Sequence, residues 1–356
     1  MSKSNNHPLI IAGPCSAESE EQLLATASAL KKLNIDIFRA GVWKPRTRPD
    51  SFEGVGSIGL TWLINVKKAT GLPTAIEVAK PVHIEEALKN EIDILWIGAR
   101  TTVNPFTVQE LAEAMKGADI RVMVKNPINP DLNLWIGAIE RIQNAGIKSV
   151  AAVHRGFSSF DNTKFKNTPT WQIPIELKRL LPDIPLICDP SHISGKRALI
   201  FEVAQKALDL DYDGLMIETH IDPNGALSDR EQQVTPDQLK KILGDLKIRK
   251  PSSDNVEFIN QLEELRSKID NMDRELLETL TARMTVVEKI GKYKKEHNVT
   301  ILQVERWRDI FKTRPQWAKK MNLNEKFIAE LYKLIHDESI RKQTGVFEKK
   351  KSATKA

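Results

Sequence analysis

Length, composition and cysteine content exclude several classes of protein. The chain has 356 residues, of which 41% are hydrophobic and 28% charged, so we expect one large and one small globular domain. No run approaches the roughly 18 apolar residues of a membrane span, and the N-terminal apolar stretch is too short for a signal peptide. Two cysteines cannot form a disulfide framework, which favours a cytoplasmic protein.

The net charge of +6 does not indicate nucleic acid, because the basic residues are unevenly distributed. Residues 1–250 carry 31 Lys and Arg against 30 Asp and Glu, whereas the last sixteen residues carry 6 against 1. That tail has no interleaved aromatic residues beyond Phe347, so we expect it to be solvated and disordered. We therefore expect neither a nucleic-acid nor a membrane partner.

Short apolar runs alternate with helix-period stretches between Leu9 and Glu218. Near-continuous hydrophobicity is typical of strands that are buried on both faces. Eight such units in about 250 residues, with no GxGxxG after the first run, favour a (β/α)8 TIM barrel over an open doubly wound sheet. The eight runs begin at Leu9, Ile35, Thr74, Ile94, Arg121, Ser149, Pro185 and Gly214.

The remainder of the chain is predicted to be all-α. From Val256 there is no proline until Pro315, and apolar residues recur at helical spacing, which predicts a first helix of nearly 40 residues. Two shorter helices are predicted at Val304–Met321 and from about Glu325 to Lys342, the latter after an Asn324 N-cap. The predicted boundaries are a barrel domain at 1–247, a linker at 248–255, a helical domain at 256–345 and a basic tail at 346–356.

A candidate metal site lies just beyond the strand ends of the predicted barrel. Parallel barrels gather such residues at one mouth, and a thiolate, an imidazole and two carboxylates suit Mn, Fe, Co or Zn. The alternative for each residue alone is structural, since a buried cysteine usually packs and an aspartate usually caps a turn. The candidate ligands are Cys15, His192, Glu218 and Asp229.

Six cations also follow the predicted strands. Cations gathered in one funnel are unfavourable unless anions fill it, and guanidinium forks suit phosphate and carboxylate. The alternative is that each cation belongs to a surface ion pair. The six are Arg39, Lys44, Arg46, Arg100, Lys125 and Arg155.

The ordered motifs at these strand ends resemble those of 3-deoxy-D-arabino-heptulosonate 7-phosphate (DAHP) synthases of type I-beta. That family condenses phosphoenolpyruvate with erythrose 4-phosphate at the start of the shikimate pathway. A sister family, which makes 3-deoxy-manno-octulosonate 8-phosphate from arabinose 5-phosphate, is the nearest alternative. It typically carries a KANRS-type loop where this chain has KPRT. The motifs are GPCS at 13–16, R-x4-KPRT at 39–47, GAR at 98–100, VKNP at 124–127, HRG at 154–156, DPSH at 189–192 and ETH at 218–220.

The resemblance implies a role for each residue of the barrel site. It implies one divalent metal ion on the four candidate ligands, with Cys15 as a thiolate, and a cationic wall that includes Lys44 as a catalytic group. The metal would act as a Lewis acid on the aldehyde. The wall would hold two dianions and stabilise phosphate departure. Phosphoenolpyruvate would bind Arg39, Lys44, Arg100, Lys125 and Arg155, and the sugar phosphate would bind Arg46 and Thr47.

Cations in the helical part have a spacing that suggests two chains. Arg283 and Lys294 are 11 residues apart and share a helix face, whereas Arg266 points about 100° away. Such a set makes sense if two chains interlock and each lends an arginine to the other's pocket. The alternative is a solvated charged face.

Residues 256–343 resemble the all-helical chorismate mutases, which rearrange chorismate to prephenate. The motifs are LRSKID at 265–270, TAR at 281–283, GKYK at 291–294, ERWRD at 305–309 and ESIRKQ at 338–343. The pericyclic reaction needs positioning and charge stabilisation rather than a nucleophile. The resemblance implies a pocket of Arg266, Arg283, Lys294, Arg306, Ser339 and Gln343, in a homodimer or tetramer.

Two departures from the mutase pattern leave a second interpretation open. Gln303 and Trp307 stand where the family usually has carboxylates. The helical domain could therefore be mainly a regulatory module that binds chorismate or prephenate. Because the barrel motifs begin at about Pro8, we expect any feedback inhibition to act through the helical domain, with prephenate as the inhibitor.

Overall fold

The computed structural model describes residues 7–45, 52–159, 163–250 and 252–348. The chain divides into two compact units, Met1–Pro251 and Ser252–Ala356, so the division falls within the predicted linker. Within the described residues, no helix has both the length and the hydropathy that crossing a bilayer requires.

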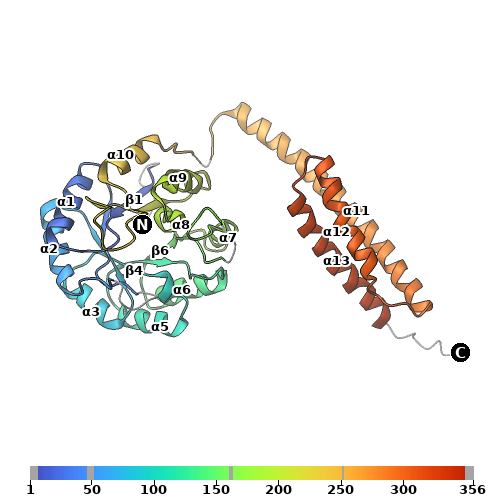
Figure 1. The fold of residues 1–356 in the computed structure, drawn as a ribbon, viewed down its shortest axis with the longest axis horizontal. Helices are drawn as coiled ribbons and strands as arrows, with labels where there is room; N and C mark the ends of the chain where they lie inside the picture. Colours follow the sequence, from blue (N-terminus) through green and yellow to red (C-terminus); the bar gives the residue numbers. More distant parts are fainter. Residues whose placement is uncertain (1–6, 46–51, 160–162, 251, 349–356) are drawn as a thin grey trace. The chain divides into compact units, whose positions relative to one another are not determined.

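The described part of the first unit forms a closed barrel of eight parallel strands in chain order, which confirms the predicted TIM barrel (Figure 1). Strands β1 and β8 close it, with Leu9 opposite Gly214 and Gly13 opposite Glu218. The strands are β1 (Leu9–Gly13), β2 (Ile37–Arg39), β3 (Thr74–Val78), β4 (Ile94–Ile97), β5 (Arg121–Lys125), β6 (Ser149–His154), β7 (Leu186–Cys188) and β8 (Gly214–Glu218).

Helices surround the strands, and several begin at the caps that their sequences supply. The side chains of Ser19, Asn104 and Asp131 accept hydrogen bonds from the first turn of the helix that follows each, and Thr235 forms a capping box with Gln238. The helices are α1 (Glu20–Lys31), α2 (Ile58–Thr70), α3 (Pro81–Lys89), α4 (Ala99–Thr102), α5 (Pro105–Ala114), α6 (Leu132–Asn144), α7 (Gln172–Leu180), α8 (Pro190–Ser194), the 3-10 turn η1 (Arg197–Leu199), α9 (Ile200–Asp209) and α10 (Pro236–Asp245).

The alternation of side chains along each strand divides the core in two. Ile10 and Ala12 of β1, like Leu95 and Ile97 of β4, pack outward against the helices. The alternate residues fill the barrel interior, next to the site at the carboxyl ends of the strands. The interior cluster consists of Ile11, Ile37, Ala75, Ile94, Trp96, Met123, Ala151, Val153, Ile187 and Met216.

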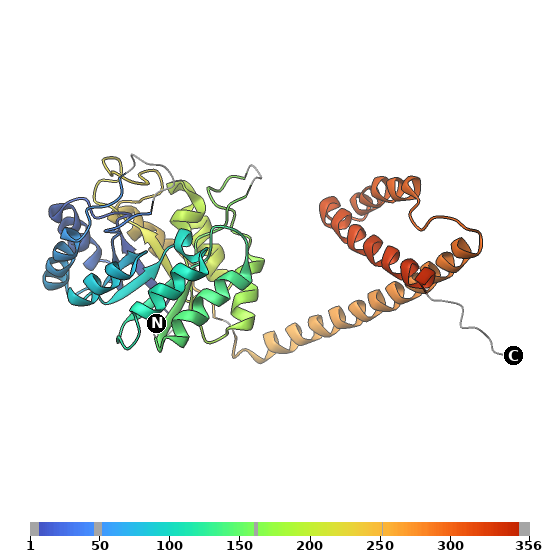
Figure 2. The ribbon, with the colours of Figure 1, turned by 90° about the horizontal axis from the view of Figure 1, so that it is seen from below.

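Residues 252–348 form three helices, α11 (Val256–Glu296), α12 (Val304–Lys320) and α13 (Glu325–Glu348). Asn324 accepts a hydrogen bond from the N–H of Phe327, as its predicted capping role requires. Helix α13 extends six residues beyond the predicted Lys342, into the first part of the predicted tail. The first turns of α11 extend past the ends of α12 and α13 (Figures 1 and 2), and their apolar side chains are exposed in the single chain.

Candidate active sites

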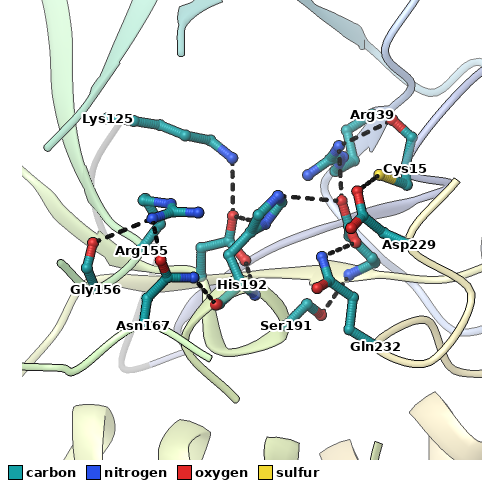
Figure 3. Close-up of polar contacts among 12 residues, drawn as sticks. Cys15, Arg39, Lys125, Arg155, Gly156, Asn167, Ser191, His192, Asp229 and Gln232 are labelled. Carbon is teal, nitrogen blue, oxygen red and sulfur yellow. Dashed lines mark hydrogen bonds and ion pairs between the residues drawn. The ribbon is translucent and has the colours of Figure 1, made fainter. Parts of the chain in front are cut away.

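The carboxyl ends of the strands bring the predicted barrel residues to one mouth. Arg39, Lys125 and Glu218 are the last residues of β2, β5 and β8, while Cys15 follows β1 and His192 lies in α8 after β7. In a parallel barrel all these positions are at the same end. Figure 3 shows the side chains of Cys15, Arg39, Lys125 and His192 converging from different parts of the barrel, so residues far apart in sequence make one site.

The four candidate metal ligands lie close together. Cys15 Sγ is 3.2 Å from Asp229 Oδ2, and His192 Nε2 is 3.7 Å from Glu218 Oε1. The Lys44 ammonium lies beside both, in contact with the Cys15 thiol and 3.7 Å from Asp229 Oδ2. Asp229 has a left-handed backbone with φ of +46°, a conformation that is held only where surrounding contacts enforce it.

Within the described residues, no three His, Cys, Asp or Glu side chains have the separations of an assembled metal shell. The donor set nevertheless fits a divalent ion. Glu218 Oε1 is buried and accepts no hydrogen bond from a described residue, although Arg39 Nη2 lies 3.3 Å from it as an ion pair. His192 Nδ1 lies 2.8 Å from Asp189 Oδ2, at ion-pair distance but outside hydrogen-bond geometry, and Nε2 lies 3.7 Å from Glu218 Oε1. A carboxylate beside the second ring nitrogen is usual for a metal-binding histidine.

Burial and neighbouring charges set the protonation of these groups. Burial, reinforced by the Glu218 charge, raises the pKa of the Cys15 thiol to about 12. For Asp229, burial acts to raise the pKa, but the charges of Lys44, His192 and Lys166 outweigh it and hold the pKa well below its usual range. The carboxylate is therefore ready for a cation, whereas the thiol needs a metal charge beside it to ionise.

The predicted phosphoenolpyruvate cations surround a cavity beside these ligands. Arg39 is 2% exposed and lies 3.3 Å from Glu218, yet its Nε and Nη1 have no hydrogen-bond partner among the described residues. Lys125 Nζ pairs with Asp189 Oδ2 at 2.8 Å. Arg155 donates from Nη1 to Asn167 Oδ1 at 2.8 Å. Buried guanidinium donors that the protein leaves unpaired favour an anion as their partner.

The other predicted cations occupy different positions. Lys44 is largely buried, whereas Arg100 is exposed at the rim although it lines the same cavity. Arg46 and Thr47, the predicted sugar-phosphate residues, lie outside the described residues. A second cavity, of about 560 Å³, adjoins the first, since both are lined by Lys166 and Asp229.

Several site residues were missed in the sequence analysis. Lys166 Nζ lies 2.9 Å from both Asp229 Oδ1 and Gln232 Oε1, and Gln232 donates from Nε2 to Glu218 Oε2 at 2.7 Å. Asn167 holds Arg155 and also donates to the His192 carbonyl. No local pattern marks these residues, because they come from the long loops that follow β6 and β8, and only the closed barrel brings these loops together. Figure 3 shows Asn167 and Gln232 beside the other labelled site residues.

In the helical unit, part of the predicted pocket is assembled within one chain. Arg283 donates to Ser339 Oγ at 2.7 Å, and both Ser339 and Gln343 are buried. Gly291 allows this approach, since a Cβ there would lie 3.2 Å from Gln343 Cγ. Lys294 Nζ donates to the Ile301 carbonyl, and its own burial lowers its pKa.

The single chain does not bring Arg266 or Arg306 to this group. Arg266 is paired with Glu263 at 2.7 Å and Arg306 with Asp309 at 2.7 Å, and both side chains are about 60% exposed. Arg266 lies 17 residues before Arg283 on the same helix, which places the two about 25 Å apart along its axis. One chain therefore cannot aim both arginines at one small ligand.

Comparison with known proteins identifies both units. Residues 1–250 match the sequence profile described as the DAHP synthetase I family. The chain belongs to the DAHP synthetase I family. Residues 265–344 match the profile of chorismate mutase type II. A chorismate mutase domain thus follows the DAHP synthase domain, which makes the chain a bifunctional enzyme of the shikimate pathway.

Individual relatives cover the synthase domain. The phospho-2-dehydro-3-deoxyheptonate aldolase of Thermotoga maritima is 29% identical over 243 residues, which cover 68% of this chain and 70% of that protein. Its crystal structure superposes with a TM-score of 0.61 at 28% identity, over 68% of this chain and 69% of that one. The 2-dehydro-3-deoxyphosphooctonate aldolase of Desulfatibacillum aliphaticivorans is also 29% identical, covering 69% of this chain and 93% of that protein.

His154, at the end of β6, has a structural role in the synthase domain. It is fully buried among Phe157, Trp171 and Tyr212. Its Nε2 donates to the Pro169 carbonyl at 2.7 Å, and its Nδ1 accepts from the Tyr212 hydroxyl at 3.0 Å. Burial lowers the pKa of His154 to about 3, so the imidazole is neutral in the folded state.

This lowered pKa predicts a pH dependence of stability. Between about pH 6.5 and pH 3 the unfolded chain binds a proton at His154 that the folded chain does not, so stability falls on acidification by roughly 1.4 kcal/mol per pH unit. In the variant His154→Gln, the amide can replace both hydrogen bonds but does not titrate. We expect its free energy of unfolding to fall by about 2 kcal/mol less than that of the parent between pH 7 and pH 5. Urea denaturation at the two pH values measures it.

His297, an exposed histidine after α11, supplies the matched control. We expect His297→Gln to lose stability with acidification as the parent does. An equal pH dependence in His154→Gln and the parent would show that His154 titrates normally in the folded barrel.

Proposed function

We propose that the barrel mouth condenses phosphoenolpyruvate with erythrose 4-phosphate at a divalent metal ion, and that the helical unit rearranges chorismate to prephenate at a pocket built from two chains. The observation that carries the first part is the convergence of unpaired Arg39 donors with a thiol, an imidazole and two carboxylates. A small dianion would satisfy the Arg39 donors, and a divalent cation would satisfy the thiol, imidazole and carboxylates.

Cys15, His192, Glu218 and Asp229 would hold the metal, with Mn, Fe, Co or Zn compatible with the mixed donors. When bound, a divalent ion supplies Lewis acidity at the aldehyde oxygen of the sugar phosphate. Asp189 orients His192 through Nδ1, and Gln232 orients Glu218 through Oε2. These contacts fix the ligands so that little rearrangement is needed on binding.

The cationic wall would bind phosphoenolpyruvate beside the metal. Arg39 offers two buried donors, Lys125 a point charge and Arg155 a guanidinium positioned by Asn167, with Arg100 at the rim. The enol carbon of phosphoenolpyruvate attacks the aldehyde, water adds to the cationic carbon so formed, and phosphate leaves from the tetrahedral product. The wall holds the two anions together and stabilises the departing phosphate, with Lys44 lining the cavity beside Asp229.

The choice of sugar phosphate rests on the loop at residues 44–47. Curated relatives include both heptonate and octonate aldolases at the same identity, so overall similarity does not decide between four and five carbons. The chain has Pro45-Arg46-Thr47 where the octulosonate enzymes typically have an asparagine-containing loop. Erythrose 4-phosphate is therefore the proposed substrate, and arabinose 5-phosphate is the control substrate in the assay below.

In the mutase, Arg283 with Ser339 would bind one end of chorismate, and Lys294 and Gln343 would face its ether oxygen. The clamp at the other end would be Arg266 of a second chain, since 25 Å separates the two arginines within one chain. Arg306 would join the same pocket. No acid or nucleophile is required, because holding the folded conformer and stabilising the developing charge drive the rearrangement.

The helical unit also exposes an apolar surface that a second copy of the chain could cover. Leu265, Ile269, Met272 and Leu276 on the first half of α11 are each more than half exposed. A largely apolar groove of about 480 Å³ runs between α11 and α13, lined by Leu280, Met284 and Ile335 among others. Exposed apolar area on this scale favours an obligate interface, so the proposed minimum assembly is a homodimer.

Regulation is proposed to act from the helical unit on the barrel. The mutase pocket recognises chorismate and prephenate, which are made later in the pathway than DAHP. Prephenate bound there would inhibit the synthase, and this regulatory role is compatible with catalysis at the same pocket. The Gln303 and Trp307 departures bear on mutase activity, since Trp307 stacks on His336 instead of presenting a carboxylate.

Metal removal tests the barrel proposal. We expect EDTA to abolish synthase turnover and a divalent ion to restore it. Cys15→Ala should lower kcat by roughly 100-fold or more, as expected when a group that holds a transition-state stabiliser is lost. Metal content by mass spectrometry and phosphate release with each sugar phosphate are the measurements.

Cys188→Ala is the matched control, since Cys188 is equally buried but packs in the outer core. It should retain metal and turnover. Undiminished turnover in EDTA would rule out the four-ligand site, and faster turnover of arabinose 5-phosphate would assign the barrel to the sister reaction.

Mixed dimers test the two-chain mutase pocket. Arg266→Ala and Arg283→Ala should each lose mutase activity, and mixing the two unfolded chains before refolding should restore about a quarter of the parent activity, because half of the dimers then contain one intact pocket. Synthase turnover should be unaffected in both variants. Arg341→Ala, which alters an exposed α13 arginine, should keep mutase activity. No recovery in a mixture shown to contain heterodimers would mean that both arginines act from one chain.

A chain shortened to end at Ser252 tests regulation. We expect prephenate to inhibit synthase turnover in the full chain and to have no effect on the shortened one. The full-length variant Arg283→Ala should also lose sensitivity while keeping its uninhibited turnover. A shortened chain that stays equally sensitive would place the inhibitor site in the barrel.

A further inference from the structure

Among the described residues of the interior cluster, one is aromatic, and its ring lies beside the cationic wall. Trp96 of β4 is fully buried and belongs to the interior cluster. Ala75 and Ala151 in the same cluster are small, which leaves room for an indole. The other described members of this cluster are aliphatic residues and methionine, so the ring is a particular feature of this layer.

The ring contacts two of the proposed phosphoenolpyruvate cations. The Arg39 guanidinium carbon lies 4.7 Å from the Trp96 ring centroid, and Lys125 Nζ lies 5.7 Å from it. Both distances are within the range in which the negative face of an indole attracts a cation. Arg39 and Lys125 come from different strands, β2 and β5, so one ring relates two otherwise separate groups.

This attraction differs in kind from the ion pairs that the same cations make. Glu218 lies 3.3 Å from Arg39 and Asp189 lies 2.8 Å from Lys125, and each carboxylate offsets part of a positive charge. An aliphatic side chain in place of Trp96 would pack but would not attract a cation. The indole quadrupole holds the cations without adding a formal negative charge, so their field stays available to an anion at the mouth.

The face of the indole, rather than its N–H, makes the relevant contact. Trp96 Nε1 has no hydrogen-bond partner among the described residues. Trp135, the other fully buried tryptophan among the largest core side chains, instead donates from Nε1 to the Val124 carbonyl at 3.1 Å. Phenylalanine at position 96 would therefore keep an aromatic face and lose no hydrogen bond to a described residue.

We propose that Trp96 is a positioning residue for phosphoenolpyruvate: its ring face holds Arg39 and Lys125 at the barrel mouth without adding a negative charge of its own. This role rests on the proposed phosphoenolpyruvate site. Trp96 itself touches no substrate, since it is fully buried and is not among the described residues that line the cavity. Its effect is on the affinity for the dianion rather than on the metal.

The test compares aromatic and non-aromatic substitutions in the metal-loaded full chain. Trp96→Met, whose flexible side chain fills irregular gaps, should raise the Kd for phosphoenolpyruvate roughly tenfold, the scale of a desolvated cation–π contact. Trp96→Phe should restore affinity to within about threefold of the parent. The KM for phosphoenolpyruvate should follow the Kd, while kcat changes little. Calorimetric titration with phosphoenolpyruvate and steady-state kinetics are the measurements, with metal content checked in each variant.

Trp135→Met is the matched control for lost packing: it should lower the thermal midpoint and leave the Kd unchanged. Equal weakening in Trp96→Met and Trp96→Phe, or unchanged affinity in Trp96→Met, would overturn the proposal. If Trp96→Met does not fold, a Kd for Trp96→Leu equal to that of Trp96→Phe would overturn it in the same way. Lys125→Met separates this inference from the site itself. If Lys125→Met binds phosphoenolpyruvate normally, the proposed phosphoenolpyruvate site is overturned. If Lys125→Met loses binding while Trp96→Met binds normally, only the role of Trp96 is overturned.

Discussion

Closure of the barrel between its first and last strands is the constraint on which the synthase site depends. Gly13 pairs with Glu218 at that seam, and the two flanking loops are then joined by further contacts. The Cys15 N–H donates to Gln233 Oε1 at 2.9 Å, and the hydroxyls of Ser16 and Ser228 lie 2.6 Å apart. These contacts place Asp229 against Cys15, more than 200 residues away in sequence. Without the seam, the proposed ligands would belong to opposite ends of the domain.

The approach of β1 to its other neighbour, β2, explains a glycine. Gly13 has φ of +146°, and a Cβ there would lie 2.1 Å from the Arg39 carbonyl oxygen. Only a residue without a side chain lets β1 approach β2 this closely at the level of the site. The GPCS motif therefore combines a backbone requirement at Gly13 with a chemical one at Cys15.

The second property of the site is that its charged side chains are buried, which strengthens the interactions between them. Water is excluded from Arg39, Lys125 and Asp189, so each interaction is stronger than it would be at the surface, and each unpaired donor is more costly. The carboxylates at Asp189 and Glu218 stay ionised despite burial because the neighbouring cations lower their pKa values. A mouth held in this state favours small anions and a divalent cation, which are the reactants and the metal that a DAHP synthase requires.

The helical unit meets its constraint differently. Arg266 and Arg283 lie far apart along one straight helix, so the proposed pocket would need an arginine from another chain. The exposed apolar face on the first half of α11 follows from the same geometry, because α12 and α13 are too short to cover all 41 residues. Catalysis and assembly are in this account two consequences of one helix length.

Much of this could be predicted from the sequence by itself. The spacing of the apolar runs predicted the barrel strands, and the proline-free amphipathic stretch predicted α11. Asn324 was predicted as the N-cap of the last helix. These features depend on local sequence pattern and on a face that must be buried. The ordered motifs indicated both families. The sequence did not indicate Lys166, Asn167 and Gln232 at the site, the exposure of Arg100, or the place of Trp96, which reads as one more apolar residue in ILWI. Those features depend on which loops cross the mouth and which way a strand faces in a closed barrel. Both are settled by contacts between residues distant in the chain, and only the tertiary structure could decide them.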